Sequence, residues 1–337
     1  MIFYKTSASD DPYYDLWNSS EWLFPFESKS LTFPKILTME TTNLCQQRCF
    51  YCSRNLMNRK IAYFDLGLME KVATEASKYN ASIRFGGWGE PLLHKKCVDI
   101  LKVCKGHGIR TTIFTNAQLL DESKMEAFCE MGLDEIRFST AGLTPEDHNE
   151  VRIKSDYERD FRSKIRMAHE VRSRFSSKKP YFSIYTHVFD YSENGFEEKK
   201  NSYIDYYLNY VDKIDIDLTN LCRVKDLDKV KPYFIRSTIN QTYKPCVNLY
   251  LKMIIFANGD LYACDQVYED DDTFLLGNLS NSPKTIFDLY HSEKAVDLRN
   301  SLRNLEHARY SLCKDCYSNT TKYEPLKEQF KQNHTQD

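Results

Sequence analysis

The sequence predicts an α/β protein, in which a partial (β/α)6 TIM-like barrel is followed by a small C-terminal α+β domain made of a β-hairpin and a helix. Short apolar runs alternate with segments of helical periodicity between about Lys35 and Thr219. Six such β-then-α units in series indicate a parallel sheet with right-handed crossovers. The pattern changes after Leu221, where β-rich runs are joined at Asn258-Gly259, a strong hairpin signal.

The strands of the barrel are expected at residues 36–40, 82–86, 111–116, 135–140, 181–189 and 213–219. Helices are expected between them, at residues 68–79, 95–106, 122–132, 157–175 and 197–211. In the second domain we expect the hairpin over 248–264 and a helix over 284–302. The domains are therefore an N-terminal extension (1–34), the barrel (35–221), the C-terminal domain (222–325) and a polar tail (326–337).

The polar side chains of the strands are expected to line the barrel lumen. Helices cover the outside of such a barrel, so the outer face of each strand must be apolar and its polar residues must point inward. The residues expected in the lumen are Arg84, Arg137, Ser139, Tyr185, His187, Asp215 and Asp217. A lumen of this kind suits a polar substrate that makes several hydrogen bonds. The alternative is that Arg–Asp pairs merely fill the barrel.

Composition excludes some classes of partner and site. The net charge of −2 gives no electrostatic footprint for nucleic acid or for an anionic membrane. The amino terminus has neither a basic region nor an apolar core of a signal peptide, and no apolar run approaches the roughly 20 residues of a membrane helix. We therefore expect a cytoplasmic protein, in which eleven cysteines indicate metal binding or catalysis rather than disulfides.

The first cysteine group, Cys45, Cys49 and Cys52, directly follows the first strand. The carboxyl ends of barrel strands carry the active site. Three thiolates can hold a cubane iron–sulfur cluster and leave one iron without a protein ligand. The alternative is a zinc site with a distant fourth ligand.

This Cys-x3-Cys-x2-Cys array, with Tyr51 before the last cysteine, resembles that of the radical S-adenosylmethionine (SAM) superfamily. The resemblance implies that Cys45, Cys49 and Cys52 hold a [4Fe-4S] cluster whose remaining iron binds SAM. One electron then cleaves SAM to methionine and a 5′-deoxyadenosyl radical, which removes a hydrogen atom from the substrate. Tyr51 would lie near the adenine.

Further motifs carry the same resemblance. The segment 86–91, Gly-Gly-Trp-Gly-Glu-Pro, is similar to the family's Gly-Gly-Glu-Pro motif, with an additional Trp88. It implies that Gly87, Gly89 and Glu90 receive the methionine amino group. Asn116 follows the third strand as in the family's Thr-Asn-Gly, although Ala117 replaces the glycine. Ser139, late in the fourth strand, would touch the ribose or the carboxylate.

The second cysteine group comprises Cys246, Cys264, Cys313 and Cys316, with Gly259 at the turn between the first two. It resembles the family's SPASM and Twitch extensions and implies one auxiliary [4Fe-4S] cluster held by all four thiolates. No cysteine follows Cys316, which favours the shorter Twitch form. A structural zinc site with four thiolates is the alternative.

The resemblance extends to the 2-deoxy-scyllo-inosamine dehydrogenase type. It implies oxidation of an alcohol to a ketone in a sugar, aminocyclitol or related small molecule, with the auxiliary cluster accepting an electron. Tyr185, His187, Asp215 and Asp217 are candidate bases by their lumen positions. A flavodoxin- or ferredoxin-type reductant is the expected protein partner.

Three alternatives remain open. An epimerase would use Cys222, in the loop after the sixth strand, as hydrogen donor. A peptide-modifying enzyme often carries an extra recognition module, for which the 34 residues before the barrel leave little room. A cluster- or zinc-binding scaffold would not cleave SAM. The other cysteines, Cys97, Cys104 and Cys129, are expected to pack in the core.

Overall fold

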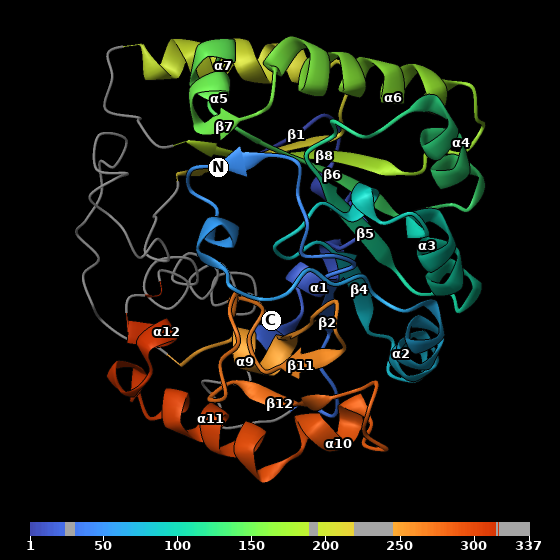
Figure 1. Cartoon of the computed structure of the whole chain (residues 1–337). Coiled ribbons are helices and arrows are strands. Elements are labelled where there is room, and N and C mark those ends of the chain that lie inside the picture. The colour runs from blue at the N-terminus through green and yellow to red at the C-terminus, as the bar shows by residue number, and fades with distance from the viewer. Residues whose placement is uncertain (24–30, 189–194, 219–244, 315, 317–337) are drawn as a thin grey trace, which may run out of the picture.

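A ten-stranded sheet forms the frame of the protein (Figure 1). The computed structural model describes residues 1–23, 31–188, 195–218, 245–314 and 316. Strands follow the order β1-β9-β8-β6-β5-β4-β2-β10-β11-β12. The six central strands are parallel neighbours and confirm all six predicted barrel strands: β2 (Ile36–Met39), β4 (Ser82–Phe85), β5 (Thr111–Thr115), β6 (Glu135–Ala141), β8 (Tyr181–Val188) and β9 (Lys213–Leu218).

Helices cover the outer face of these strands (Figure 1). The predicted helices are present as α2 (Leu66–Lys78), α3 (Cys97–Gly106), α4 (Glu122–Glu130), α6 (Ser163–Ser173) and α7 (Phe196–Tyr207). Side chains of Asp65 and Asp121 accept backbone hydrogen bonds at the starts of α2 and α4, as helix N-caps do. The expected helix over 157–175 begins as a π-helical turn, η5 (Tyr157–Arg162), before α6.

Strands β6, β8 and β9 separate apolar from polar residues, as predicted. Ile136, Phe138, Ile184 and Ile216 have 0% exposure beneath the helices. Tyr185, His187, Asp215 and Asp217, which alternate with apolar residues along β8 and β9, are partly exposed. The alternation therefore assigns the outer face of the sheet to the core and leaves the polar face for chemistry.

The C-terminal hairpin continues the barrel sheet. Its strands β10 (Lys252–Ile255) and β11 (Asp260–Tyr262) are antiparallel, as predicted, and β12 (Leu275–Asn278) pairs with β11. In addition, β10 pairs in parallel with β2, from Lys252 opposite Ile36 to Ile255 opposite Met39. The hairpin and the barrel thus share one backbone hydrogen-bond network.

Two predicted boundaries in this region are wrong. The hairpin was expected to begin at Asn248, but Asn248–Leu251 form a helical turn, α9, whose residues are all buried. A short, fully buried apolar run does not distinguish helix from strand. The helix expected over 284–302 is divided into α10 (Ile286–Tyr290) and α11 (Glu293–Arg303), because Ser292 caps the second helix.

The N-terminal segment packs on the far edge of the sheet. Strand β1 (Ile2–Tyr4) is antiparallel to β9, and Asp11 forms a buried ion pair of 2.5 Å with Lys213. Three short helical elements follow: η1 (Ala8–Asp10), α1 (Tyr14–Trp17) and η2 (Ser20–Leu23).

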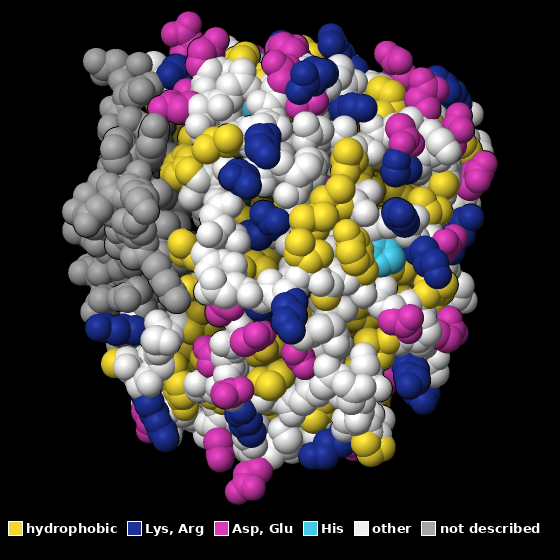
Figure 2. All heavy atoms as spheres, viewed as in Figure 1, with side chains coloured by type: hydrophobic (Ala, Val, Ile, Leu, Met, Phe, Trp, Pro, Cys, Tyr) yellow, Lys and Arg dark blue, Asp and Glu magenta, His cyan; other side chains and the backbone are white. Residues whose placement is uncertain are grey.

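Several short elements complete the described chain: η3 (Ser53–Leu56), η4 (Pro91–Leu93), α5 (Pro145–Val151), η7 (His307–Arg309) and α12 (Ser311–Lys314). Figure 2 shows Lys and Arg intermixed with Asp and Glu over the upper and right-hand parts of one face. Among the described helices, none has the length and apolar character needed to cross a membrane.

Candidate active site and auxiliary cysteine site

The first cysteine group lies in the loop after β2. Cys45, Cys49 and Cys52 are partly buried. They lie close enough together for charge on Cys49 or Cys52 to act on the Cys45 thiol. Burial raises the pKa of Cys45 to about 12 and that of Cys52 to about 11. At neutral pH, thiols of this kind keep their protons until a metal replaces them. Three thiols on one loop fit the donor set of a cluster with one open iron.

The first cysteine group differs from a site for a single metal ion. Within the described ranges, no three His, Cys, Asp or Glu side chains converge as a metal site. A cubane cluster binds each thiolate to a different iron, so the three sulfur atoms of such a site need not meet at one point.

A two-stranded ribbon ties this loop to the lumen wall. Strand β3 (Arg48–Cys49) pairs with β7 (Arg152–Ile153). The Arg152 side chain is buried; its Nε donates to the Tyr51 hydroxyl (3.0 Å) and its Nη2 to Ser139 Oγ (2.8 Å). Its Nη1 also donates to Gln47 Oε1 (3.4 Å). Arg152 was not predicted as a site residue, because a two-residue strand has no periodicity and no motif surrounds it.

Glu90 and Asn116 connect the glycine-rich loop to the first cysteine. The buried Glu90 carboxylate accepts hydrogen bonds from Thr115 Oγ1 (2.7 Å) and from the Asn116 backbone N–H (2.9 Å). Burial raises the pKa of Glu90 above its ordinary value, against the lowering effect of these hydrogen bonds. The Asn116 side chain donates to Cys45 Sγ at 3.7 Å and accepts from Gln46 Nε2 at 3.0 Å. The structure thus brings three predicted site residues together.

The glycines of this loop have identifiable packing roles. Gly87 has a φ of +91°, which disfavours any residue with a side chain. At Gly89, a Cβ would lie 1.9 Å from the Thr42 carbonyl oxygen, and the Glu90 N–H donates to the Leu44 carbonyl at 2.8 Å. The loop must therefore lie directly against the cysteine loop.

The predicted lumen residues form a continuous wall beside the cysteine loop. The Tyr51 and His187 ring centroids are 5.1 Å apart, and those of His187 and Tyr185 are 4.7 Å apart. The Tyr185 hydroxyl then donates to Asp217. This wall, which we call the Tyr51–Asp217 wall, comprises Tyr51, His187, Tyr185 and Asp217.

Asp215 belongs to a different arrangement. It forms an ion pair with Arg137 at 2.5 Å, and the Arg137 guanidinium lies 4.8 Å from the Tyr185 ring centre. The interpretation that an Arg–Asp pair fills the barrel therefore holds for this pair. Arg84 lies over the Phe114 ring, at 4.8 Å from its centre.

The second cysteine group gathers segments far apart in the sequence. Cys246, Cys264 and Cys313 are buried in one hydrophobic cluster with residues such as Tyr250 and Phe256. Burial raises the pKa of Cys264 well above its ordinary value. The charges of Asp265 and of the other three cysteines, Cys316 included, raise it further. Burial also raises the pKa of Cys246 to about 12. The mutual influence of all four thiols fits a shared four-thiolate site.

The other cysteines are accounted for in part. Cys97, Cys104 and Cys129 are buried in α3 and α4 within the main core, as predicted. All ten cysteines of the described ranges are free of disulfides. Cys222 lies outside the described residues.

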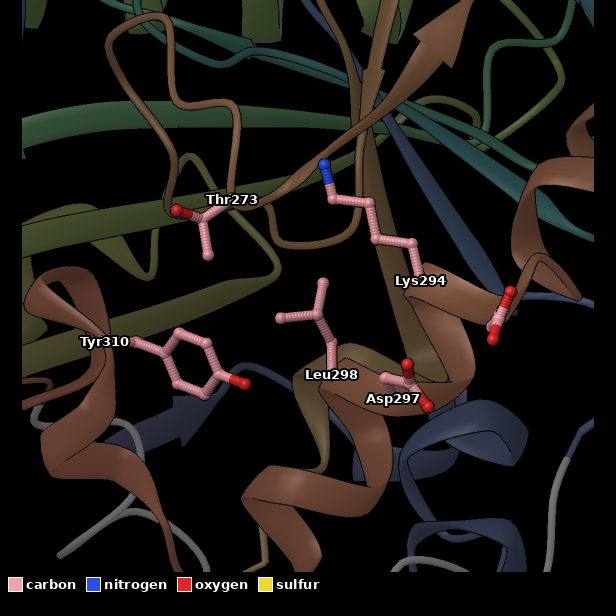
Figure 3. Close-up of a pocket in the computed structure, with 6 residues that line it drawn as sticks. Thr273, Lys294, Asp297, Leu298 and Tyr310 are labelled. Carbon is pink, nitrogen blue, oxygen red and sulfur yellow. The ribbon is translucent and has the colours of Figure 1, made fainter.

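A pocket of about 410 Å³ lies on the C-terminal domain, between α11 and the loop that carries Thr273 (Figure 3). Lys294, Asp297, Leu298 and Tyr310 line it. None of the predicted site residues lines this pocket, so it contributes nothing to the site described above.

Family-level comparison covers both cysteine groups. The sequence pattern of the Radical SAM superfamily matches residues 39–195, and that of SPASM, an iron–sulfur cluster-binding domain, matches residues 246–317. The chain belongs to the radical SAM superfamily. Membership implies SAM and a [4Fe-4S] cluster in the barrel of this radical SAM protein, and an auxiliary iron–sulfur cluster in its C-terminal domain.

Solved structures share the fold at low sequence identity. Similar structures include BtrN in complex with AdoMet and 2-DOIA, with 17% identity, a TM-score of 0.55, and coverage of 85% of this chain and 93% of that chain. Another is anSMEcpe with bound AdoMet (17% identity, TM-score 0.58, coverage 90% and 93%). SuiB of Streptococcus suis bound to the precursor peptide SuiA has 18% identity, a TM-score of 0.58, and coverage of 94% and 78%.

Curated relatives match over shorter regions. A tungsten-containing aldehyde ferredoxin oxidoreductase cofactor-modifying protein of Pyrococcus furiosus is 32% identical over 107 residues, which are 31% of this chain and 30% of that protein. The PqqA peptide cyclase of Gluconobacter oxydans is 33% identical over 113 residues (33% and 31%). The chain thus matches about a third of the length of these relatives.

Proposed function

We propose that this radical SAM enzyme oxidises a hydroxyl-bearing carbon of a polar small molecule, such as a sugar or an aminocyclitol, to a ketone. The observation that supports this proposal is the Tyr51–Asp217 wall, which extends from the cysteine loop to a carboxylate in the lumen. When bound, SAM and its cluster supply the radical that takes a hydrogen atom from carbon, and the auxiliary cluster supplies an acceptor for the second electron.

In this proposal, the SAM site lies between the two loops that follow β2 and β4. Gly87, Gly89 and Glu90 would face the methionine part, and Tyr51 the adenine. Support comes from the direct contact between the loops and from Asn116, which hydrogen-bonds at Cys45. Ser139 would contribute through Arg152, whose guanidinium it contacts at 2.8 Å.

Asp217 is our candidate for the base that accepts the substrate hydroxyl proton. Asp215 is a poorer candidate, because it is already held in an ion pair with Arg137 at 2.5 Å. Asp217 instead accepts a hydrogen bond from the Tyr185 hydroxyl, which orients its carboxylate in the lumen. His187, between Tyr51 and Tyr185, would set the depth at which a substrate is held.

Peptide modification is a second candidate, because the relatives include PqqA peptide cyclases and one similar structure holds a precursor peptide. Epimerisation with Cys222 as hydrogen donor is a third. Whether the substrate is a small molecule or a peptide, we propose a flavodoxin- or ferredoxin-type reductant. We also propose a cytoplasmic setting, in keeping with the ten free cysteines of the described chain.

Product analysis tests the proposed function. The reconstituted, dithionite-reduced enzyme is given SAM with aminocyclitols, sugars or peptides in deuterated water, and 5′-deoxyadenosine and carbonyl products are quantified. We expect one ketone per 5′-deoxyadenosine, trapped as its oxime with hydroxylamine, and no solvent deuterium at the carbon from which hydrogen was taken. Solvent deuterium at an inverted carbon, lost in Cys222→Ala, would establish epimerisation instead. Turnover of peptides alone would establish peptide modification.

A further inference from the structure

Trp88, the additional residue in the glycine-rich motif, enters the C-terminal domain. Its indole Nε1 donates to the Val267 carbonyl at 2.6 Å, and its ring meets the Tyr268 ring edge-to-face with centroids 5.9 Å apart. The side chain also packs against the hydrophobic cluster that contains Cys246, Cys264 and Cys313. A residue of the barrel motif thus belongs to the wall of the auxiliary cysteine site.

The segment that Trp88 contacts begins at an auxiliary cysteine. The Val267 N–H donates to the Cys264 carbonyl at 3.3 Å. A continuous path of hydrogen bonds therefore runs from the indole through the Val267 peptide groups to Cys264. We call residues 264–268 the bridging segment.

Arg59, at the end of the first cysteine loop, contacts the same segment. Its Nε donates to the Tyr268 carbonyl at 3.0 Å, while its two Nη atoms bind Glu40 at 2.8 and 2.7 Å. The guanidinium also stacks 3.7 Å from the centre of the Phe256 ring. Side-chain exposures of 5% for Arg59 and 0% for Glu40 mean that breaking this ion pair would strand a buried charge.

On the barrel side, Glu40 contacts both Arg59 and the glycine-rich loop. It directly follows β2, and its Oε1 also accepts from the Ala257 N–H at 3.3 Å. A Cβ on Gly87 would lie 3.3 Å from Glu40 Cβ, so the glycine-rich loop rests on this carboxylate's stem. Both loops of the proposed SAM site are therefore held by one segment of the C-terminal domain.

We propose that Trp88 and Arg59 are positioning residues through which occupation of the auxiliary cysteine site strengthens SAM binding in the barrel. A filled auxiliary site fixes Cys264, and with it the bridging segment. The bridging segment then holds the glycine-rich loop and the first cysteine loop in their SAM-binding arrangement. The inference rests on the proposed function for the location of the SAM site. Such a link is a coupling free energy between two sites, measurable without turnover.

A double-mutant cycle on SAM affinity tests the coupling. Equilibrium dialysis gives the SAM Kd of anaerobically reconstituted wild type, Trp88→Phe, Cys313→Ala/Cys316→Ala and the triple variant, each with its first-site iron quantified. We expect Trp88→Phe and the double cysteine variant each to weaken SAM binding about fivefold. The triple variant should be no weaker than either, because all three break one connection.

Matched controls separate coupling from loss of stability. Tyr290→Phe removes a buried hydrogen bond of 2.8 Å to the Tyr250 carbonyl within the same domain but outside the bridging segment. It should lower the unfolding midpoint and leave the SAM Kd unchanged. Arg59→Lys keeps the charge beside Glu40 but loses the guanidinium N–H that also donates to the Tyr268 carbonyl. This variant should weaken SAM binding with all cysteines intact.

Three results would overturn the inference. The first is an unchanged Kd in Trp88→Phe at full first-site iron, a comparison that does not depend on the folding of the cysteine variant. The second is a triple variant whose loss equals the product of the separate losses. The third is a wild-type enzyme that binds no SAM, which would also overturn the proposed function, whereas the first two leave that function intact.

Discussion

Arg152 carries a buried positive charge between the cysteine loop and the lumen wall. Its guanidinium donates to Tyr51 and Gln47 of the cysteine loop and to Ser139 of β6. Without it, the Tyr51 hydroxyl and Ser139 lose a charged donor. Charge-assisted hydrogen bonds of this kind contribute more to affinity and order than neutral ones.

Arg152→Gln should therefore weaken SAM binding at least about tenfold, since hydrogen bonds to a charged group contribute about 1.5–3 kcal/mol. The SAM Kd from equilibrium dialysis checks this, with first-site iron measured alongside. Arg159→Gln is the control, because that arginine also pairs with an aspartate, Asp160, but its side chain is 72% exposed. An equal loss in both variants would contradict a specific role for Arg152.

Asp217→Asn should lower kcat at least about 100-fold if Asp217 is the base, the lower range for general base catalysis. Uncoupled 5′-deoxyadenosine formation should persist, because SAM cleavage does not need this proton transfer. Asp215→Asn should act mainly on the unfolding midpoint by leaving Arg137 without its ion pair. Loss of kcat in Asp215→Asn with retention in Asp217→Asn would reverse the assignment.

At the level of elements, α5 joins β6 to η5 through a buried histidine. His148 contacts Thr140 Oγ1 at 2.8 Å and Ser155 Oγ at 3.0 Å, and its ring meets the Tyr157 ring. Burial lowers the pKa of His148 to about 3; the charge of Arg152 acts in the same direction and that of Asp160 opposes it. Thr144 and Pro145 at the start of α5 form a regular N-terminal signal that sequence inspection could have used.

Acidification should therefore destabilise this region. The unfolded chain takes up a proton near pH 6.5, while the folded His148 does not, so the stability contribution is full above pH 6.5 and is lost as pH falls toward 3. Between pH 6.5 and pH 5, the loss is about 2 kcal/mol. Urea unfolding at pH 7 and 5 should show this loss in wild type and a smaller one in His148→Gln. Equal losses would exclude His148 as the cause.

A second link between elements is the cap that α2 provides for α10. The Glu75 carboxylate accepts from the Ile286 N–H (2.9 Å) and the Phe287 N–H (2.7 Å) at the start of α10. Glu75→Ala should lower the free energy of unfolding by about 1–2 kcal/mol, the value of a lost helix cap. Glu70→Ala, which removes an exposed ion pair with His107 from the same helix, should change it by less than about 0.5 kcal/mol. Urea denaturation compares the two.

Sequence periodicity was sufficient for the large elements and for the residues that follow strands. Alternation located β6, β8 and β9, and with them Tyr185, His187 and Asp217. The β3–β7 ribbon and Arg152 could not be found in this way, because two-residue strands form only after distant segments meet. The division of the helix over 284–302 depends on a single N-cap, Ser292. The start of the hairpin was misplaced because residues 248–251 are buried on all sides, so they show no helical or strand periodicity. Cys222 lies outside the described residues, so its role stays a prediction.

For the whole molecule, two clusters should be measurable as metal content. Anaerobic reconstitution should give about eight irons and eight sulfides per chain, and Cys313→Ala/Cys316→Ala about four of each. Iron and sulfide assays with zinc analysis check this. One zinc with four irons in wild type would identify the C-terminal cysteines as a structural zinc site.

The parallel pairing of β10 with β2 has a practical consequence for dividing the protein. Strand β2 leads into the first cysteine loop, and the Ile255 carbonyl accepts the N–H of Glu40 at its end (2.9 Å). An expressed barrel that stops before residue 245 would leave one edge of β2 bare, which invites pairing with another molecule. We expect such fragments to precipitate, and the intact chain to melt in a single calorimetric transition.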